Sequence, residues 1–139
     1  HVMQIRLAAR LHDIGKLTLA DEAAGGTEES LTGDDLDAYK EHPTRGSELL
    51  RAAAGQDIAD AVARHHERWD GTGFPDGLTE DAIPLDARII AVANALDRWS
   101  ISGGAPDRPT PEAVQRAVEQ GELMFDPSVV EAAAAAFAQ

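Results

Sequence analysis

The sequence contains no cysteine. Disulfide bonds, thiolate metal ligands and thiol nucleophiles are therefore excluded, so any metal ion must be bound by histidine and carboxylate side chains. Positive charge is also scarce, because 12 Lys and Arg residues stand against 25 Asp and Glu residues, which gives a net charge of −13. This charge opposes a surface that binds nucleic acid or anionic lipid. A phosphate-containing ligand would need a local attraction, such as a metal site.

Long apolar runs are absent as well. No segment approaches the roughly 20 consecutive apolar residues of a membrane-spanning helix, and the first residues do not have the pattern of a signal peptide. We therefore expect a soluble, cytoplasmic protein without membrane insertion. The 139 residues, 43% of them hydrophobic, suffice for one domain with a core of its own. Because residue 1 is His and not Met, we expect a piece of a longer protein, which leaves room for domains upstream.

The spacing of apolar residues is typical of helices. Residues 5, 8, 9, 11 and 14 recur near the 3.6-residue period and predict a helix that ends at Gly15. Similar patterns predict helices over 32–42, beyond Pro43, over 58–66 and over 85–99, and two closing helices that open at Thr110 and Asp126, each followed by proline. Polar residues at 21–37 predict a mobile loop, and Gly and Pro predict loops at 70–77 and 102–109. No stretch alternates with period two, so the predicted fold class is all-α.

The histidines carry the functional signal. His12 precedes Asp13, His42 belongs to a separate helix, and His65 and His66 are adjacent. A single histidine on an apolar face is more often a core residue, but several on separate helices near a glycine-rich loop indicate a metal site that needs no cysteine. Neighbouring residues of a helix point about 100° apart, so His65 and His66 are not expected to bind the same ion. With two adjacent ions, each of these histidines can bind a different ion. Pairs of metal ions are common in phosphodiester hydrolysis.

Four strings of residues have a recognisable order. Residues 11–16 read Leu-His-Asp-Ile-Gly-Lys, and residues 41–43 read Glu-His-Pro. Residues 65–78 read His-His-Glu-Arg-Trp-Asp-Gly-Thr-Gly-Phe-Pro-Asp-Gly-Leu, and residues 83–93 read Ile-Pro-Leu-Asp-Ala-Arg-Ile-Ile-Ala-Val-Ala. Together they resemble the HD-GYP family, a branch of the HD superfamily of metal-dependent phosphohydrolases that hydrolyses the bacterial second messenger cyclic di-GMP. The resemblance runs from about Leu7 to Trp99 and implies an HD-domain helical bundle with a glycine-rich GYP-type loop.

The resemblance also implies site residues, cofactors and partners. The implied metal ligands are His12, Asp13, His42, His65, His66 and Asn94. The implied catalytic residues are Asp13, which bridges two metal ions, and Lys16, which lies on the same helix face and steadies charge on the phosphate. The implied substrate-binding residues are Lys16, Arg68, Gly73, Phe74 and Asp97. Iron or manganese is the favoured divalent metal, and zinc or nickel is also compatible. The implied ligand is cyclic di-GMP or a related nucleotide, and the implied partner is a second copy in a homodimer or an upstream sensory domain.

The sequence departs from the family pattern at three places. The family has a further histidine ligand upstream of His12, so we expect residues 1–139 to form a single HD-GYP-like domain without its first helix. Asn94 stands where the superfamily has an aspartate ligand, so at least one metal ion should bind more weakly. Residues 102–109 replace a segment that supplies phosphate-binding and base-binding side chains in the family.

Two classes of function remain open at this point. The first is a metal-dependent phosphodiesterase that opens cyclic di-GMP, with activity reduced by Asn94 and by the missing upstream ligand. The second is a degenerate HD-GYP domain that acts as a regulatory or protein-interaction module in cyclic di-GMP signalling. The intact polar cluster favours the first, because buried polar groups are costly to keep without a function. A third, related reading is an HD phosphohydrolase that acts on another nucleotide. Trp69 and Trp99 are expected to be core residues rather than base-stacking platforms.

Overall fold

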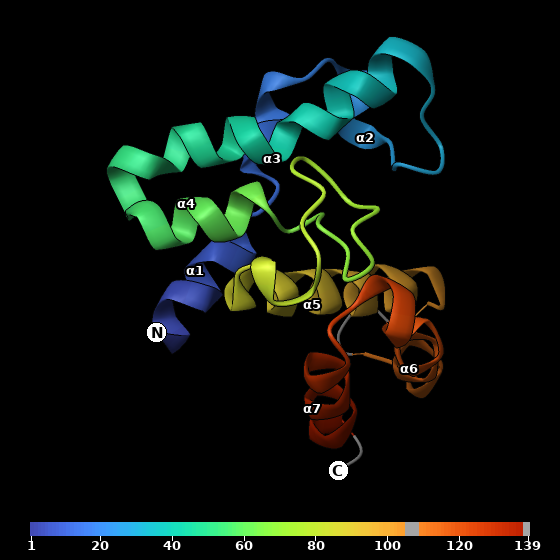
Figure 1. Cartoon of the computed structure of the whole chain (residues 1–139). Coiled ribbons are helices and arrows are strands. Elements are labelled where there is room, and N and C mark those ends of the chain that lie inside the picture. Colours follow the sequence, from blue (N-terminus) through green and yellow to red (C-terminus); the bar gives the residue numbers. More distant parts are fainter. Residues whose placement is uncertain (105–108, 138–139) are drawn as a thin grey trace.

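The computed structural model describes residues 1–104 and 109–137, and Figure 1 shows them as helices joined by loops. The elements are α1 (Val2–Leu11), η1 (Ile14–Thr18), α2 (Asp21–Gly25), α3 (Gly33–Ala54), α4 (Gln56–Ala63), η2 (Glu80–Ala82), α5 (Leu85–Ser102), α6 (Pro111–Met124) and α7 (Pro127–Phe137). Within the described residues, the bridge between Asp70 and Thr79 is the single β-type pairing. The predicted all-α fold class is therefore confirmed. No helix in this part of the chain is long and apolar enough to span a membrane.

Helix α5 contacts two hydrophobic cores. The first core joins it to α1, α3 and α4 and contains Ala8, Leu50, Ile58, Ala61, Val62 and Ile90. The second core joins it to α6 and α7 and contains Val92, Leu96, Ala113, Ala117, Phe125 and Val130. Figure 1 shows α1, α3 and α4 on one side of α5 and α6 and α7 on the other. Because both sides are covered, the apolar stripe predicted over 85–99 extends around much of the helix.

The mobile loop predicted over 21–37 is wrong, because helix α2 and the beginning of α3 lie in this segment. Ala23 of α2 is fully buried. Between the two helices, Glu29 pairs with Arg98 of α5 over 3.3 Å. The polar composition predicts a loop, but one buried alanine and contacts with distant residues give the segment its local structure.

Three helix ends also differ from the prediction. The first helix ends at Leu11 and is followed by a turn and by η1, and the helix predicted over 58–66 ends at Ala63. Helix α3 runs without interruption through the buried Pro43, although the sequence predicts a break there. Proline lacks the N–H that would bond to the carbonyl four residues earlier. The carbonyl group of Tyr39 therefore lacks its helical partner, and the side chain of the neighbouring His42 bonds to it instead.

Candidate metal centre

Four histidines and one aspartate, from segments in or next to α1, α3 and α4, lie close together. His12 and Asp13 lie in the turn after α1, His42 lies within α3, and His65 and His66 lie in the turn after α4. The Nε2 atoms of His42 and His65 are 3.1 and 3.8 Å from Asp13 Oδ1, and that of His12 is 3.5 Å from Asp13 Oδ2. Donor atoms of Asp13, His42, His65 and His66 all lie within 4.8 Å of one another. We call these five residues the histidine cluster.

Two glycines bring Asp13 close to α3. A Cβ atom on the buried Gly15 of η1 would collide with the carbonyl oxygen of His42 and would lie 2.7 Å from the backbone nitrogen of Gly46. A Cβ atom on Gly46 would in turn lie 3.2 Å from the backbone nitrogen of Gly15. Only residues without side chains allow this approach of η1 to α3. The approach places Asp13, which directly precedes η1, beside His42.

Three histidines of the cluster are oriented by the same hydrogen bond. In His12, His42 and His65, Nδ1 lies 2.6 to 2.7 Å from the carbonyl oxygen of the residue three positions earlier. Because a carbonyl group can only accept, Nδ1 carries the proton and Nε2 keeps its lone pair. The three Nε2 atoms lie around Asp13. Metal-binding histidines use this arrangement, with one ring nitrogen held by the protein and the other free for the ion.

The carbonyl groups that accept these bonds lack a partner within their helix. Those of Ala9 and Val62 belong to the last turns of α1 and α4, where C=O groups have no intrahelical partner. That of Tyr39 lies inside α3, but the residue whose N–H would reach it is Pro43. His42 Nδ1 takes the place of that missing N–H. The proline of the Glu-His-Pro string thus frees the carbonyl that orients the preceding histidine.

The donor set of the cluster fits a divalent metal ion. The Nε2 atoms of all four histidines and Oδ1 of Asp13 are buried and have no hydrogen-bond partner. Buried polar atoms without partners are costly. The lone pair of His42 Nε2 also faces Asp13 Oδ1 at 3.1 Å, and two acceptors at this distance repel each other unless a cation lies between them. A metal ion bound here would satisfy the donor atoms of Asp13, His42, His65 and His66, which lie within 4.8 Å of one another.

The protonation states of the cluster suit metal binding. Burial lowers the pKa of His65 to about 3, and it lowers the pKa of His66 well below the usual value. Both imidazoles are therefore neutral at pH 7, which is the form that binds metal ions. Burial alone would raise the pKa of the Asp13 carboxyl, but the neighbouring polar and charged side chains, among them the ammonium group of Lys16, outweigh it and hold this pKa far below its usual range. Asp13 is an anion at neutral pH.

Lys16 contacts the cluster from η1. Its Nζ donates a hydrogen bond to Asp13 Oδ2 over 2.8 Å and lies 5.2 Å from the centroid of the Tyr39 ring. The sequence places Lys16 one turn further along the helix of His12, but α1 has ended before His12. The 3-10 turn of η1, and not a continuation of α1, brings the ammonium group to Asp13.

His65 and His66 do not have the predicted geometry. They lie in the turn that follows α4 and not on a helix. Their ring centroids are 4.2 Å apart, and both contribute a donor atom to the same group around Asp13. The argument against a shared ion assumed the 100° rotation between helical neighbours, and this assumption does not hold for the turn after α4. This geometry does not by itself require two ions.

Glu67 and Tyr39 belong to the site but had no predicted role. Glu67 is buried, and its two carboxylate oxygens accept hydrogen bonds from the backbone N–H groups of Asp76 and Leu78 over 2.7 and 2.9 Å. It thus ties the glycine-rich loop to the turn after α4. Tyr39 is buried with its ring centroid 4.8 Å from that of His42. Burial raises its pKa to about 12, so its phenol stays protonated. The signal for Glu67 is its place directly after His65 and His66, since a carboxylate next to clustered histidines needs hydrogen-bond donors of its own if it is buried.

Two residues predicted to bind substrate pack against the cluster. Phe74 is stacked on His66 with ring centroids 4.7 Å apart and an angle of 15° between the planes. A Cβ atom on Gly73 would lie 2.5 Å from the carbonyl oxygen of His66, so only glycine allows the loop to approach this turn. The structure gives both residues a packing reason that is independent of a ligand.

Two cavities flank the histidine cluster. The Lys16 cavity, of about 300 Å³, is lined by Lys16 and Asp97, and the His66 cavity, of about 320 Å³, is lined by His66 and Arg68. Asn94 lines both cavities. The structure therefore brings every predicted site residue to the cluster, to the loop packed on it or to one of these cavities.

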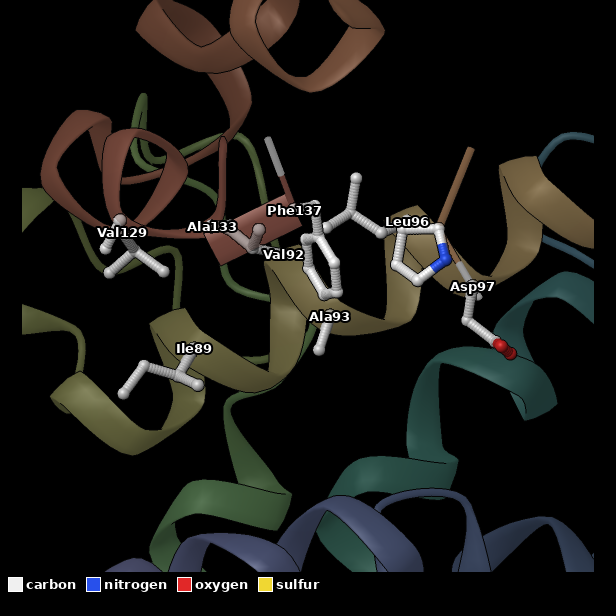
Figure 2. A pocket seen from close by; sticks show the side chains of 10 residues that line it. Ile89, Val92, Ala93, Leu96, Asp97, Val129, Ala133 and Phe137 are labelled. Carbon is white, nitrogen blue, oxygen red and sulfur yellow. The ribbon is translucent and has the colours of Figure 1, made fainter. Parts of the chain in front are cut away.

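A third cavity of about 480 Å³ lies between α5 and α7 and is separate from the cluster. Figure 2 shows its apolar lining, with Ile89 and Leu96 from α5 and Val129 and Phe137 from α7. Asp97 is its single charged lining residue and is shared with the Lys16 cavity. Because one carboxylate is not a metal-binding set, this cavity is no second metal site.

Comparison with known proteins decides the family. The chain matches the family model of the HD domain over residues 1–129. It belongs to the HD domain family. This HD domain is 40% identical over 133 residues to the cyclic di-GMP phosphodiesterase response regulator RpfG of Xanthomonas campestris, an alignment that covers 92% of the chain and 35% of the relative. It is 36% identical over 138 residues to a cyclic di-GMP phosphodiesterase of Thermotoga maritima, with 94% and 36% covered. The HD-GYP resemblance is confirmed, and the chain spans about a third of the length of these relatives.

Two solved structures are similar to this HD domain. An HDG"Y"P protein from Bdellovibrio bacteriovorus aligns with a TM-score of 0.75 at 24% identity, over 98% of this chain and 44% of the other. A cyclic GMP-AMP specific phosphodiesterase from Vibrio cholerae aligns with a TM-score of 0.61 at 27% identity, over 72% of this chain and 24% of the other. The predicted HD-domain helical bundle is confirmed by these alignments.

Proposed function

We propose that this HD domain binds divalent metal ions and hydrolyses a phosphodiester bond of cyclic di-GMP. The observation that carries the proposal is the convergence of four unpartnered Nε2 atoms on the Asp13 carboxylate. The names of the relatives support cyclic di-GMP as the substrate, because several of these relatives are named cyclic di-GMP phosphodiesterases. The net charge of −13 agrees with a local cationic centre as the source of attraction for a phosphate.

The residues that would hold metal are those of the histidine cluster. His42, His65, His66 and Asp13 form one donor group, His12 lies beside them, and Asn94 offers an amide oxygen from α5. We propose two ions, with iron or manganese favoured and zinc or nickel also compatible with imidazole and carboxylate donors. Bound divalent ions polarise phosphoryl oxygens and supply a nucleophile at neutral pH by lowering the pKa of water.

Asp13 and Lys16 are the proposed catalytic residues. Asp13 is anionic at neutral pH and central to the donor group, so it can hold two cations next to each other. Lys16 is held at Asp13 by its 2.8 Å hydrogen bond and lines the adjoining cavity. Its ammonium group is placed to offset negative charge that develops on the phosphate. Arg68 and Asp97, which line the flanking cavities, are the proposed substrate contacts, and Gly73 and Phe74 shape the loop behind His66.

The test combines metal analysis with turnover. Wild-type protein is purified, its metal content is measured by mass spectrometry, and hydrolysis of cyclic di-GMP is followed with added manganese or reduced iron. His42→Ala should lose most of the metal and all measurable turnover, because it removes the fully buried donor nearest to Asp13. His1→Ala is the matched control, since His1 is exposed and its ring pairs with Asp86, which is not a residue of the cluster. Wild-type protein without metal and without turnover would refute the proposal.

A second candidate function follows from Asn94 and from the segment after α5. Asn94 lines both flanking cavities without a charge, and residues 102–109 lack the phosphate-binding segment of the family. Residues 105–108 of that segment lie outside the described residues. Metal binding and cyclic di-GMP binding without hydrolysis would favour a regulatory module. The relative of 30% identity named 3'3'-cGAMP-specific phosphodiesterase 2 supports including that nucleotide in the assay.

A further inference from the structure

The His66 cavity extends from the histidine cluster to α6. His65 and His66 line one part of it, and Trp99 of α5 and Arg116 of α6 line another. The guanidinium carbon of Arg116 lies 4.4 Å from the centroid of the Trp99 ring. Trp99 is itself held edge-to-face against Phe125, with ring centroids 6.1 Å apart. Arg116 is therefore seated on a fixed aromatic surface, within the cavity that opens beside the proposed catalytic centre.

Arg116 differs from the other two arginines that line this cavity. Arg68 is paired with Asp70 over 3.3 Å, and Arg98 is paired with Glu29 over 3.3 Å. Among the side chains that the structure describes, none forms an ion pair with Arg116. A guanidinium group stacked on an indole ring keeps its planar fork of N–H donors at the edge. Such a fork matches two acceptors in one plane, as in guanine or a phosphate.

The mixed charge of the cavity lining favours guanine over a phosphate. Glu28 and Glu29 also line the His66 cavity, where they pair with Lys40 and Arg98. Their remaining oxygen atoms favour a ligand that offers a hydrogen-bond donor as well as acceptors. Guanine offers the acceptors N7 and O6 along one edge and an N2 amino donor on the other. Arginine donors match the first edge and carboxylates can accept from the second. Adenine has an N6 amino donor where guanine has O6, and arginine cannot accept from it.

We propose that Arg116, seated on Trp99, recognises one guanine base of the substrate while the scissile phosphate lies at the histidine cluster. The proposal rests on the proposed function for the location of the phosphate. It makes Arg116 a specificity residue that lies outside the four strings of the sequence resemblance. It also explains how this chain binds a base although residues 102–109 lack the base-binding segment expected from the family.

The test compares three variants on three substrates. Arg116→Ala, Arg116→Lys and the control Arg6→Ala are assayed with cyclic di-GMP, 3'3'-cGAMP and cyclic di-AMP at saturating manganese. Arg6 is an exposed arginine of α1, so its loss changes the net charge equally. Arg116→Ala should raise KM for cyclic di-GMP about tenfold or more, the scale of one bidentate base contact, with kcat within about twofold. KM for cyclic di-AMP should stay within about twofold, and Arg116→Lys should recover little because its ammonium group is not a planar fork.

The outcomes separate this proposal from the proposed function. An unchanged KM for cyclic di-GMP overturns the role of Arg116, and an equal rise for all three substrates assigns Arg116 to a phosphate and also overturns it. If the wild-type protein hydrolyses none of the three, the proposed function fails. Calorimetric titration of the metal-loaded protein with GMP and AMP then tests whether Arg116 recognises guanine. A preference for GMP that disappears in Arg116→Ala supports guanine recognition, and equal binding of GMP and AMP by the wild type overturns it.

Discussion

At the residue scale, the side chain at position 94 would set how much negative charge lies beside the proposed metal centre. Asn94 lines both cavities that flank the histidine cluster. An amide oxygen can bind a metal ion but contributes no charge. Within the cluster itself, Asp13 is the single carboxylate, and part of its charge is offset by Lys16. Most of the donors are neutral imidazoles, so one added carboxylate should have a large effect on the affinity for divalent ions.

Asn94→Asp is therefore expected to tighten metal binding by about tenfold, which corresponds to roughly 1.4 kcal/mol, and to raise turnover of cyclic di-GMP at limiting manganese. Metal titration and initial rates at limiting and saturating manganese measure both effects. Gln4→Glu on the exposed part of α1 is the matched control, because it makes the same amide-to-carboxylate change away from the cluster. Equal affinity and equal rates in Asn94→Asp would show that the amide is an adequate ligand. Tighter binding without faster hydrolysis would favour the regulatory module.

At the element scale, the position of η1 on α3 depends on the absence of one side chain. Gly15 is buried, and a Cβ atom there would meet the backbone of His42 and Gly46. Because the obstacle is backbone, neither helix can relieve the collision by a side-chain rotation. Any displacement of η1 also moves Asp13 and Lys16 relative to the histidines.

We expect Gly15→Ala to lower the free energy of unfolding by about 2 kcal/mol, the scale of overpacking in a core, and to weaken metal binding. Chemical denaturation and metal titration measure the two effects. Gly25→Ala in α2 is the control, since a Cβ atom there meets nothing within 4 Å. A Gly15→Ala protein that binds metal like the wild type would contradict the dependence of the cluster on this helix contact.

The junction of α5 and α7 depends on the buried carboxylate of Asp126. Its Oδ1 accepts hydrogen bonds from the backbone N–H and the hydroxyl of Ser128 over 2.8 and 2.7 Å, and its Oδ2 accepts one from Arg88 over 2.7 Å. Burial alone would raise the pKa of Asp126, but the bonds from Ser128 and Arg88 outweigh it and lower the pKa below its usual value. The carboxylate thus caps α7 and ties it to α5.

Asp126→Asn should lower the free energy of unfolding by about 2 kcal/mol at pH 7, the scale of hydrogen bonds to a charged group. Because the folded-state pKa lies below the unfolded value of about 3.9, this contribution is complete above about pH 4 and is lost as the pH falls through the folded-state pKa. Urea denaturation at pH 7, 5 and 3 measures the difference, with Asp37→Asn on the exposed face of α3 as control. A difference between Asp126→Asn and wild type that stays constant down to pH 3 would contradict the assignment.

At the scale of the whole molecule, the sequence predicts the fold class and the set of clustered residues but not their local geometry. Apolar residues recur with the 3.6-residue period within each helical segment. The all-α class therefore follows from local patterns. The end of α4 at Ala63 has no such signal, because Val62 and His66 continue the helical spacing. The contact of Arg116 with Trp99 joins residues of two helices, and no local pattern predicts it. Tertiary contacts decide both features.

The metal-free fold should be at its least stable in acid, because the histidine cluster buries neutral imidazoles. The pKa of His65 is lowered to about 3 and that of His66 well below its usual value. In the unfolded chain, each regains a pKa of about 6.5. The unfolded state therefore binds more protons below pH 6.5, and the stability falls as the pH decreases from about 6.5 toward the folded-state values. Chelator-treated protein, melted at pH 7.5, 6.5 and 5.5, should show this loss.

A metal ion that binds the folded chain should stabilise the whole molecule. At a free manganese concentration of 100 times the dissociation constant, the stabilisation is about 2.7 kcal/mol, which for a chain of this length corresponds to a rise of about 10 °C in Tm. The rise should persist at pH 6, where the imidazoles of His65 and His66 are still neutral. Scanning calorimetry before and after chelation measures it. Magnesium, which prefers oxygen ligands, is the control at equal ionic strength and should give little change. Equal shifts with magnesium and manganese would contradict binding at the imidazoles and would place the ions on the acidic surface instead.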